Sequence, residues 1–319
     1  MDLVKKTTLS LLGCCVIIFC YPGNAVGNAP SDNSSFNGSF TDSLDNLLDN
    51  LDGQAGMYLY HFDQEKSYAY NADTVFTSAS MVKLPILITI YDKIEAGKFD
   101  RSDEFAFKEE YKPASFPHMV GNLHPGSEVP LSELIMMMIS FSDNTASLWL
   151  QALAGGGENI NQVMLDLDLC HTYVNSRTEG REAEFEQYGW GQTTPREMTS
   201  LMKQLYQREL ISPLASESMY RVLSRSYYES EALSQMPAEI NVASKQGAVS
   251  HSRSETVVVN APSGSYAFTI ITQNQSDTSW DVDNDGYELI RNISRTLFEE
   301  FEPEYDYNPP TQEQIERWY

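Results

Sequence analysis

A serine and a lysine three residues apart, Ser80 and Lys83, form the first pair in the sequence that could do chemistry. The residues from Met81 to Ala96 have a helical pattern of apolar side chains, so Ser80 falls at the predicted helix N-terminus. Three residues are nearly one helical turn, which places the lysine amine beside the serine hydroxyl. A partly desolvated amine can activate that hydroxyl, and the N–H groups of a helix N-terminus favour developing negative charge. The pair fits a nucleophile and its base, although a capping serine and a solvated lysine have the same spacing.

Two further short motifs carry polar groups that could complete such a site. The triplet Ser-Asp-Asn at residues 142–144 lies in a break between two helical patterns and offers a second hydroxyl and an amide. Its aspartate and asparagine would also serve as caps of the helix that follows. The triplet Lys-Gln-Gly at residues 245–247 lies inside a strand-like run. A lysine followed by glycine on an edge strand lets a substrate backbone approach closely, and an edge lysine also protects against aggregation.

The apolar patterns predict the elements that must position these motifs. Their order is a helix, a two-stranded hairpin, many helices, three strands and a final helix. Strands near both ends with helices between them predict an α/β fold of the α+β type, with one mainly antiparallel sheet, terminal helices on one face and an inserted helical lobe. The predicted helices are 40–51, 81–96, 132–140, 145–153, 159–167, 195–206, 214–223 and 287–301, and the predicted strands are 57–62, 67–70, 242–248, 256–261 and 266–272.

The first 27 residues have the pattern of a secretory signal peptide. Lys5 and Lys6 precede an apolar run that ends at Cys20 and is followed by small residues. The run is too short to span a bilayer, so we expect a cleaved signal and a secreted protein, extracellular or periplasmic, with no stable membrane insertion. An uncleaved anchor and a lipoprotein modified at Cys14 are the alternatives. Residues 28–40 indicate a polar linker. Cleavage would leave Cys170 as the one cysteine, so we expect it to be buried and outside any disulfide.

The composition is typical of a globular protein. The 319 residues are 41% hydrophobic, which excludes a disordered chain and a polytopic membrane protein. The 45 acidic residues against 21 basic ones give a net charge of −24. Because such a surface repels phosphate backbones, we expect no nucleic-acid partner. We also expect a monomer, with residues 302–319 as an extended acidic tail.

No metal or other cofactor is expected. The five histidines are scattered without the spacing of metal ligands. Residues 281–286 are similar to the first half of a calcium-binding loop, but Asn292 stands where the bidentate glutamate belongs. The segment more simply caps the last helix.

With all three motifs in this order, the sequence resembles the class A β-lactamase-like family of penicillin-recognising serine hydrolases. The resemblance covers residues 40–300 and includes flanking residues: Leu-Pro after Lys83, Phe141 before the Ser-Asp-Asn triplet, Thr-Ala after it, and Thr-Thr-Pro at residues 193–195. It implies a two-lobed β-lactamase/DD-peptidase-like domain over residues 41–301. Its five-stranded antiparallel sheet lobe would comprise residues 41–92 and 213–301, and its helical lobe residues 93–212.

The resemblance implies a role for each matching residue. Ser80 would be the nucleophile that forms an acyl-enzyme, and Lys83 would accept or relay its proton. Ser142 would pass a proton to the leaving nitrogen. Asn144 would hold the substrate amide, and Lys245 would pair with Ser142 and the substrate carboxylate.

Other positions complete this implied site. The backbone N–H groups of Ser80 and Ala248, the latter after Gly247, would form the oxyanion hole. Arg253 would clamp a carboxylate, or else be a surface arginine. Tyr111 would stack on substrate at the cleft rim, with packing in the core or at the rim as the alternative.

Two departures from the family pattern concern affinity and turnover. Gln246 replaces the threonine of Lys-Thr-Gly, so a glutamine amide stands where a small hydroxyl would contact the substrate. Glu179 follows an arginine where the family places the glutamate that activates water, but Glu182 and Ala183 stand where leucine and asparagine belong. Glu179 is thus a candidate deacylation base, or one solvated acid among several.

Together with the predicted signal peptide, the resemblance therefore implies an exported hydrolase acting on β-lactams, with a small molecule or a peptidoglycan peptide as substrate. The alternatives are a D-alanyl-D-alanine peptidase or another penicillin-binding amide or ester hydrolase, and a non-catalytic binding or sensor protein with the same fold.

Overall fold

The computed structural model describes residues 36–116 and 118–318. The predicted signal peptide, residues 1–27, and most of the predicted linker lie outside these residues. The linker was predicted to reach residue 40, but helix α1 (Gly38–Asp49) already begins before that point. Asn37 caps this helix, because its side chain accepts a hydrogen bond from the backbone N–H of Ser39 at 3.3 Å.

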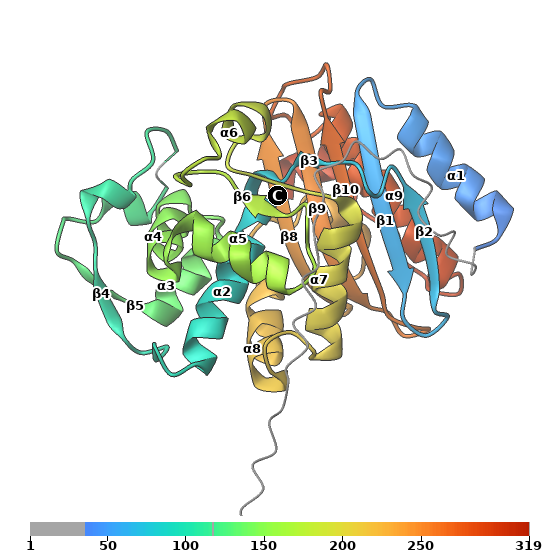
Figure 1. Cartoon of the computed structure of the whole chain (residues 1–319). Helices are drawn as coiled ribbons and strands as arrows, with labels where there is room; N and C mark the ends of the chain where they lie inside the picture. Colours follow the sequence, from blue (N-terminus) through green and yellow to red (C-terminus); the bar gives the residue numbers. More distant parts are fainter. Residues whose placement is uncertain (1–35, 117, 319) are drawn as a thin grey trace, which may run out of the picture. The chain divides into compact units, whose positions relative to one another are not determined.

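A five-stranded antiparallel sheet forms the centre of the fold, as predicted. Its order is β2-β1-β10-β9-β8, so strands from the two ends of the chain pair directly in the middle of the sheet (Figure 1). β8 is an edge strand, as the lysine motif on it predicted. The strands are β1 (Gln54–His61), β2 (Lys66–Tyr70), β8 (Asn241–Val249), β9 (Ser252–Asn260) and β10 (Tyr266–Gln273).

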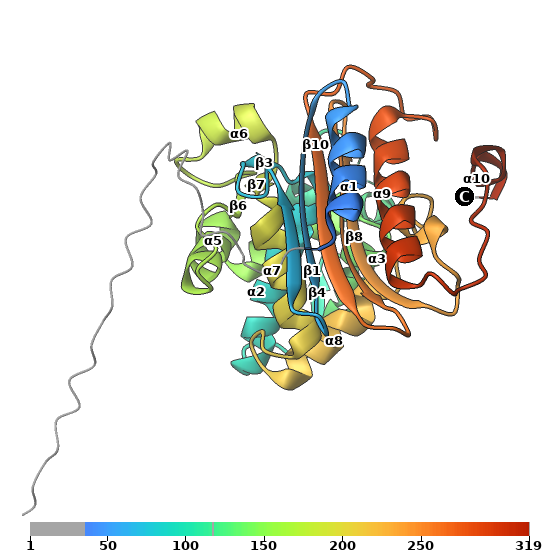
Figure 2. The same ribbon diagram turned by 90° about the vertical axis from the view of Figure 1, so that its right-hand side faces the viewer.

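Alternation along the strands gives the sheet two different faces. On β9, Val257 and Val259 pack into one core, whereas Val258 packs into the other. The first core is covered by α1 and α9 (Asp285–Phe301), which lie side by side on this face (Figure 2). Asn284 caps α9 by accepting the N–H of Gly286 at 3.0 Å, so the predicted capping role of this segment is confirmed.

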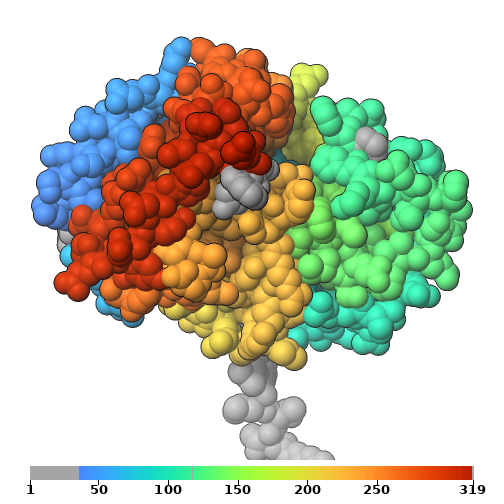
Figure 3. Space-filling view, turned by 180° about the vertical axis from the view of Figure 1, so that it is seen from behind, coloured from blue at the N-terminus to red at the C-terminus, as the bar shows by residue number. Residues whose placement is uncertain are grey.

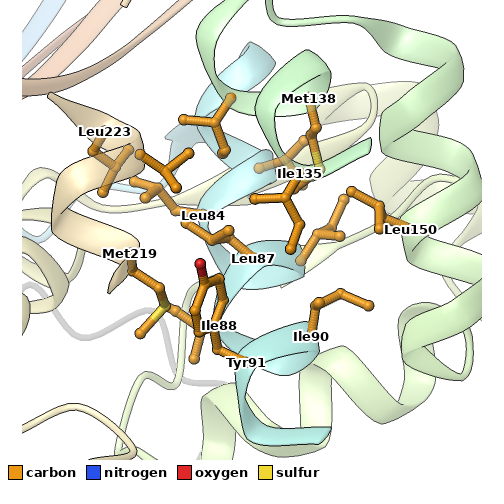
Figure 4. Packing of buried hydrophobic residues seen from close by; sticks show 14 of the residues in the cluster. Leu84, Leu87, Ile88, Ile90, Tyr91, Ile135, Met138, Leu150, Met219 and Leu223 are labelled. Atoms are coloured by element: carbon orange, nitrogen blue, oxygen red, sulfur yellow. The ribbon is translucent and has the colours of Figure 1, made fainter. Parts of the chain in front are cut away.

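The opposite face of the sheet supports the helical part of the molecule. Helix α7 packs on β1, β9 and β10, and α2 is the central helix of this layer, buried from Lys83 to Tyr91. Apolar side chains of α2, α3, α4 and α8 meet there in one cluster (Figure 4). These helices are α2 (Lys83–Glu95), α3 (Leu131–Ser140), α4 (Asn144–Ala154), α5 (Gly156–Asp166), α7 (Pro195–Gln207) and α8 (Pro213–Leu223).

Several short elements were not predicted, because they are too short to show a period. They are two small sheets, β3 (Phe76–Thr77) with β7 (Gly191–Thr193) and β6 (Tyr173–Val174), and β4 (Glu104–Ala106) with β5 (Glu128–Pro130), together with helix α6 (Glu182–Tyr188) and four 3-10 turns, η1 (Ala79–Val82), η2 (Glu109–Tyr111), η3 (Val120–Asn122) and η4 (Ala232–Gln235).

The C-terminal residues differ from the predicted extended tail. Helix α10 (Gln312–Trp318) forms within them, and Ile315 is buried. Tyr305 donates a hydrogen bond to Glu239 at 2.6 Å, and its ring packs on Phe298 of α9. The tail, dark red in Figure 3, therefore lies against the body of the protein. Its apolar residues explain the difference, since a purely charged segment would gain nothing from packing.

Cys170 is half-buried and disulfide-bonded, so the expectation of a buried cysteine outside any disulfide is wrong. The other three cysteines, at positions 14, 15 and 20, lie outside the described residues. Among the described residues, no helix combines the length and the apolar character that a membrane crossing needs.

Candidate active site

Ser80 lies in the 3-10 turn η1, directly before the central helix. The sequence predicted a helix from residue 81, but α2 begins at Lys83 after this single tight turn. Ala79 has a φ of +45°, an uncommon backbone conformation for a residue with a side chain. The neighbouring side chain of Met81 is fully buried. The turn is thus anchored in the core while Ser80 stays partly accessible.

Lys83 is fully buried and is the centre of a polar cluster. Its Nζ atom lies 2.9 Å from Ser80 Oγ, 3.0 Å from Ser142 Oγ, 2.8 Å from the Ser142 carbonyl oxygen and 2.9 Å from Asn144 Oδ1. Burial lowers the pKa of Lys83 to about 7, and the charge of Asp143 acts in the opposite direction. At neutral pH a large fraction of this amine is therefore neutral and can accept a proton from Ser80.

The Ser-Asp-Asn triplet has both of the roles that its sequence left open. Asp143 caps α4, accepting the N–H of Ala146 at 2.9 Å and that of Val120 at 3.0 Å. Ser142, with a φ of +53°, and Asn144 instead direct their side chains to Lys83. One loop between α3 and α4 thus provides both the helix cap and two members of the cluster.

Lys245 on β8 approaches the same cluster from the sheet. It is fully buried, and its Nζ lies 3.1 Å from Ser142 Oγ. Its other acceptors are the carbonyl oxygen of Gln246 at 2.8 Å and the Oε1 atom of the same residue at 2.5 Å. The Gln246 amide oxygen therefore accepts a hydrogen bond from the Lys245 ammonium. Burial and the nearby Lys83 lower the pKa of Lys245, whereas Glu255 and Glu231 raise it.

Gly247 lets β8 pack directly against the nucleophile turn. A Cβ atom at this position would lie 2.9 Å from the backbone nitrogen of Ser80, 2.9 Å from the carbonyl oxygen of Ser78 and 2.7 Å from Ser254 Oγ. The first two are backbone atoms that cannot rotate away. A glycine is required here, and it lets β8 approach the Ser80 backbone closely.

The structure does not join three of the predicted site residues, Arg253, Tyr111 and Glu179, to this cluster. Arg253 lies on β9 in register with Ala248, on the sheet face that α9 covers. Its guanidinium is buried between the rings of Trp280 and Tyr287, 4.7 and 4.6 Å from their centroids. It is neither a substrate clamp nor a surface arginine here. Strand alternation is the reason, because Lys245 and Arg253 fall on opposite faces.

Tyr111 is also away from any substrate surface. It is buried and stacks on Trp149 at 5.3 Å, so the core-packing alternative is the correct one. An exposed aromatic residue near the cluster is Phe116, 72% exposed, whose carbonyl oxygen accepts a hydrogen bond from Asn144 Nδ2 at 3.3 Å. Sequence reasoning missed Phe116 because its loop has no periodicity to indicate which side chains face out.

Glu179 is exposed, and in the part of the chain that the structure describes it forms no hydrogen bond with Ser80, Lys83 or Asn144. The preceding Arg177 is directed elsewhere, donating to the carbonyl oxygens of Glu110 and Lys112. The structure therefore brings together the two lysines, the two hydroxyls and the amide, but does not join the predicted water-activating acid to them. No group of three or more metal-ligating side chains occurs among residues 36–116 and 118–318.

Comparison with known proteins identifies the family of this chain. A family model described as the β-lactamase enzyme family matches residues 39–301. The chain belongs to the β-lactamase enzyme family. A β-lactamase of Rhodobacter capsulatus is 24% identical over 260 residues, which are 77% of this chain and 83% of that protein.

Solved structures support the β-lactamase family fold. The structure of PBP-A has a TM-score of 0.74 at 23% identity and covers 83% of this chain and 97% of its own. A β-lactamase from Sphaerobacter thermophilus has a TM-score of 0.72 at 22% identity, covering 85% and 98%. A variant of PBP-A, solved as an acyl-enzyme complex with penicillin G, has a TM-score of 0.75 at 22% identity, covering 84% and 98%. At these identities the likeness shows the fold, which is that of the class A β-lactamases and PBP-A.

Proposed function

We propose that this member of the β-lactamase family is an exported class A-type serine hydrolase that β-lactams acylate at Ser80. The observation that carries the proposal is the 2.9 Å contact between Ser80 Oγ and the Lys83 amine, whose pKa burial lowers to about 7. A hydroxyl and a partly neutral amine at this distance form a nucleophile with its base.

Acylation would proceed through the residues that contact Lys83. The neutral Lys83 amine takes the Ser80 proton as Ser80 Oγ bonds to the lactam carbonyl carbon. The N–H groups of Ser80 and Ala248 stabilise the oxyanion. When the C–N bond breaks, the nitrogen takes a proton from Ser142, and Ser142 is reprotonated by the Lys83 ammonium 3.0 Å away. The serine proton thus ends on the leaving nitrogen, and both Lys83 and Ser142 return to their starting states.

The remaining polar groups would orient the substrate. The Lys245 ammonium offers a counter-charge to the carboxylate that β-lactams and cell-wall peptides carry. The Asn144 amide, held between Lys83 and the Phe116 carbonyl, offers a hydrogen bond to the substrate side-chain amide. The aromatic ring of Phe116 would lie at the entrance.

The exposure of Glu179 favours slow release of the acyl group. With no carboxylate joined to Ser80 or Lys83, water attack on the acyl-enzyme lacks an obvious base in the described residues. This observation supports a second candidate function, a penicillin-binding D-alanyl-D-alanine peptidase or related amide or ester hydrolase. A non-catalytic binding protein is the third, and the intact cluster argues against it.

Intact-mass measurement after incubation with penicillin G tests acylation. Wild-type protein should gain one penicillin G, and Ser80→Ala should gain none. Ser78→Ala is the matched control, since among the described residues the hydrogen-bond contact of Ser78 Oγ is a long one, 3.5 Å to the Ala79 carbonyl. Equal labelling of Ser80→Ala, or no adduct on wild type, would disprove the proposal.

Turnover of nitrocefin and of a D-alanyl-D-alanine peptide separates the two hydrolase candidates. We expect slow nitrocefin turnover that Glu179→Ala leaves unchanged within about threefold, because the Glu179 side chain is solvated. A large loss in this variant would instead make Glu179 the deacylation base.

Export is tested separately by sequencing the N-terminus of the mature protein, which should begin near residue 28.

A further inference from the structure

Two buried glutamates lie behind Lys245, and the mechanism above does not use them. Glu255 on β9 is fully buried, and Glu231, directly before η4, is 8% exposed. Both interact electrostatically with each other and with Lys245. Glu255 Oε1 and Glu231 Oε2 are buried and have no hydrogen-bond partner at ordinary distance among the described residues, although the Ser244 hydroxyl acts on Glu255 and the Ser230 hydroxyl on Glu231. Buried carboxylates in this condition are costly, so they call for a physical reason.

The backbone holds the two glutamates in place. Glu255 Oε2 accepts the N–H of Ala232 at 2.9 Å, and the Ala232 carbonyl accepts a hydrogen bond from Ser294 of α9 at 2.8 Å. The residue that follows Glu231 is therefore fixed between β9 and α9. On the other side, Glu255 is in register with Gln246, whose side chain contacts the Lys245 ammonium.

The charges around the pair come from every element packed against it. Lys245 reaches it from β8, and Arg291 and Tyr287 from α9. Tyr228 reaches it from the loop before Glu231. Burial raises the pKa of both carboxyls, and their mutual repulsion adds to the rise for Glu255.

Burial has the opposite effect on Lys245, because it disfavours the protonated form of a lysine. Lys245 is fully buried, its hydrogen-bond partners are all neutral, and the amine of Lys83 shares Ser142 with it. A buried ammonium beside a second amine needs a nearby negative charge to stay protonated. Two carboxylates close together in a buried site cannot both ionise easily and tend to share one proton.

We propose that Glu231 and Glu255 are positioning residues that share one proton and together hold the single negative charge that keeps Lys245 protonated. This inference rests on the proposed function only in giving Lys245 its use, which is to bind the substrate carboxylate. Glu231 and Glu255 do not touch the substrate and act through Lys245.

Replacing both glutamates with glutamine tests the proposal, because glutamine has nearly the same shape and cannot ionise. In Glu231→Gln/Glu255→Gln the pKa of Lys245 should fall by about one unit or more. NMR of ¹³C-labelled lysine measures this pKa, and the variant Lys245→Arg identifies the Lys245 signal. Each single variant keeps one ionisable carboxylate, so its shift should be less than half as large. The matched control is Glu229→Gln, an exposed residue of the same loop, which should shift nothing.

The pH profile of acylation by penicillin G gives a second readout. The alkaline limb should move to lower pH in the double variant, while the acid limb, set by Lys83, stays in place. A merely structural defect would lower the rate at every pH instead. An unchanged Lys245 titration in the folded double variant overturns the proposal. If wild type is not acylated, the proposed function fails, but the NMR test still decides this inference.

Infrared spectroscopy of the wild type and single variants covers the case in which the double variant does not fold. Near neutral pH the wild type should show the C=O band of one buried protonated carboxyl group. Either single variant should lose that band, because the remaining carboxylate no longer has a like charge beside it. A wild type without the band refutes the shared proton.

Discussion

The substitution Gly247→Ala should strongly lower the rate of Ser80 acylation while leaving the fold intact. The added methyl group would lie 2.9 Å from the Ser80 nitrogen and from the Ser78 carbonyl oxygen, both backbone atoms. Ordinary contact begins about 0.5 Å farther out, so β8 must move away from η1 by roughly that amount. The N–H of Ala248 would then be displaced from the oxyanion that it should stabilise.

The size of the effect follows from the loss of one donor. Removing a single oxyanion-hole hydrogen bond costs about 3 kcal/mol, or roughly 100-fold in rate. Because Lys83 and Ser80 are on the other side of the contact, their 2.9 Å hydrogen bond should persist. The loss should thus appear in the second-order rate constant of acylation and not in the identity of the labelled residue.

Stopped-flow labelling with a fluorescent penicillin measures that constant. The matched control is Gly38→Ala on α1, where the added Cβ would meet no atom within 4 Å. Thermal unfolding of both variants shows whether the fold survives. If Gly247→Ala is folded and is acylated within about threefold of the wild-type rate, the close packing of β8 against the nucleophile turn does not govern catalysis, and the reasoning is wrong.

Three further predictions follow from the polar cluster. Lys83→Met should reduce acylation of Ser80 by about 10³-fold, measured by intact mass against time, since the general base is lost. In wild type the acylation rate should rise with pH through about 7, because the Lys83 ammonium that predominates below its pKa cannot accept a proton. A rate that does not change between about pH 5.5 and 8.5, roughly one to two units on either side of the Lys83 pKa, would contradict this. Asp143→Ala should lower the free energy of unfolding by about 2–3 kcal/mol in urea denaturation, because the N–H groups of Ala146 and Val120 lose their buried acceptor. A loss no larger than that of the exposed cap variant Asn37→Ala would argue against this role.

Much of the fold could be predicted because its elements are long and periodic. All five strands of the main sheet and the helices around Lys83 and Ser142 occur within a few residues of their predicted bounds. Motif spacing also indicated which residues converge, since each motif stands at the end or edge of such an element. The tight turn at Ser80 was missed because four residues of 3-10 helix look like the start of an α-helix.

The residues predicted wrongly depend on information that a single sequence does not carry. The direction of Arg253 depends on the register between β8 and β9, and one residue of register reverses the face. Tyr111 and Phe116 lie in the same loop region, and only the packing of Trp149 decides which ring is buried. The role of Glu231 could not be predicted, because its partner Glu255 is distant in the sequence and the two residues come close only in the folded chain.

The hydroxyl of Ser142 accepts a hydrogen bond from α2 on one side and from β8 on the other. The Ser142 oxygen therefore links the helical layer to the sheet by hydrogen bonds, in addition to the packing of α7 on β1, β9 and β10. A ligand bound beside Ser142 would contact both layers at once. Binding should therefore also make the protein more rigid. A small displacement between the two layers would separate the two amines and should abolish acylation of Ser80.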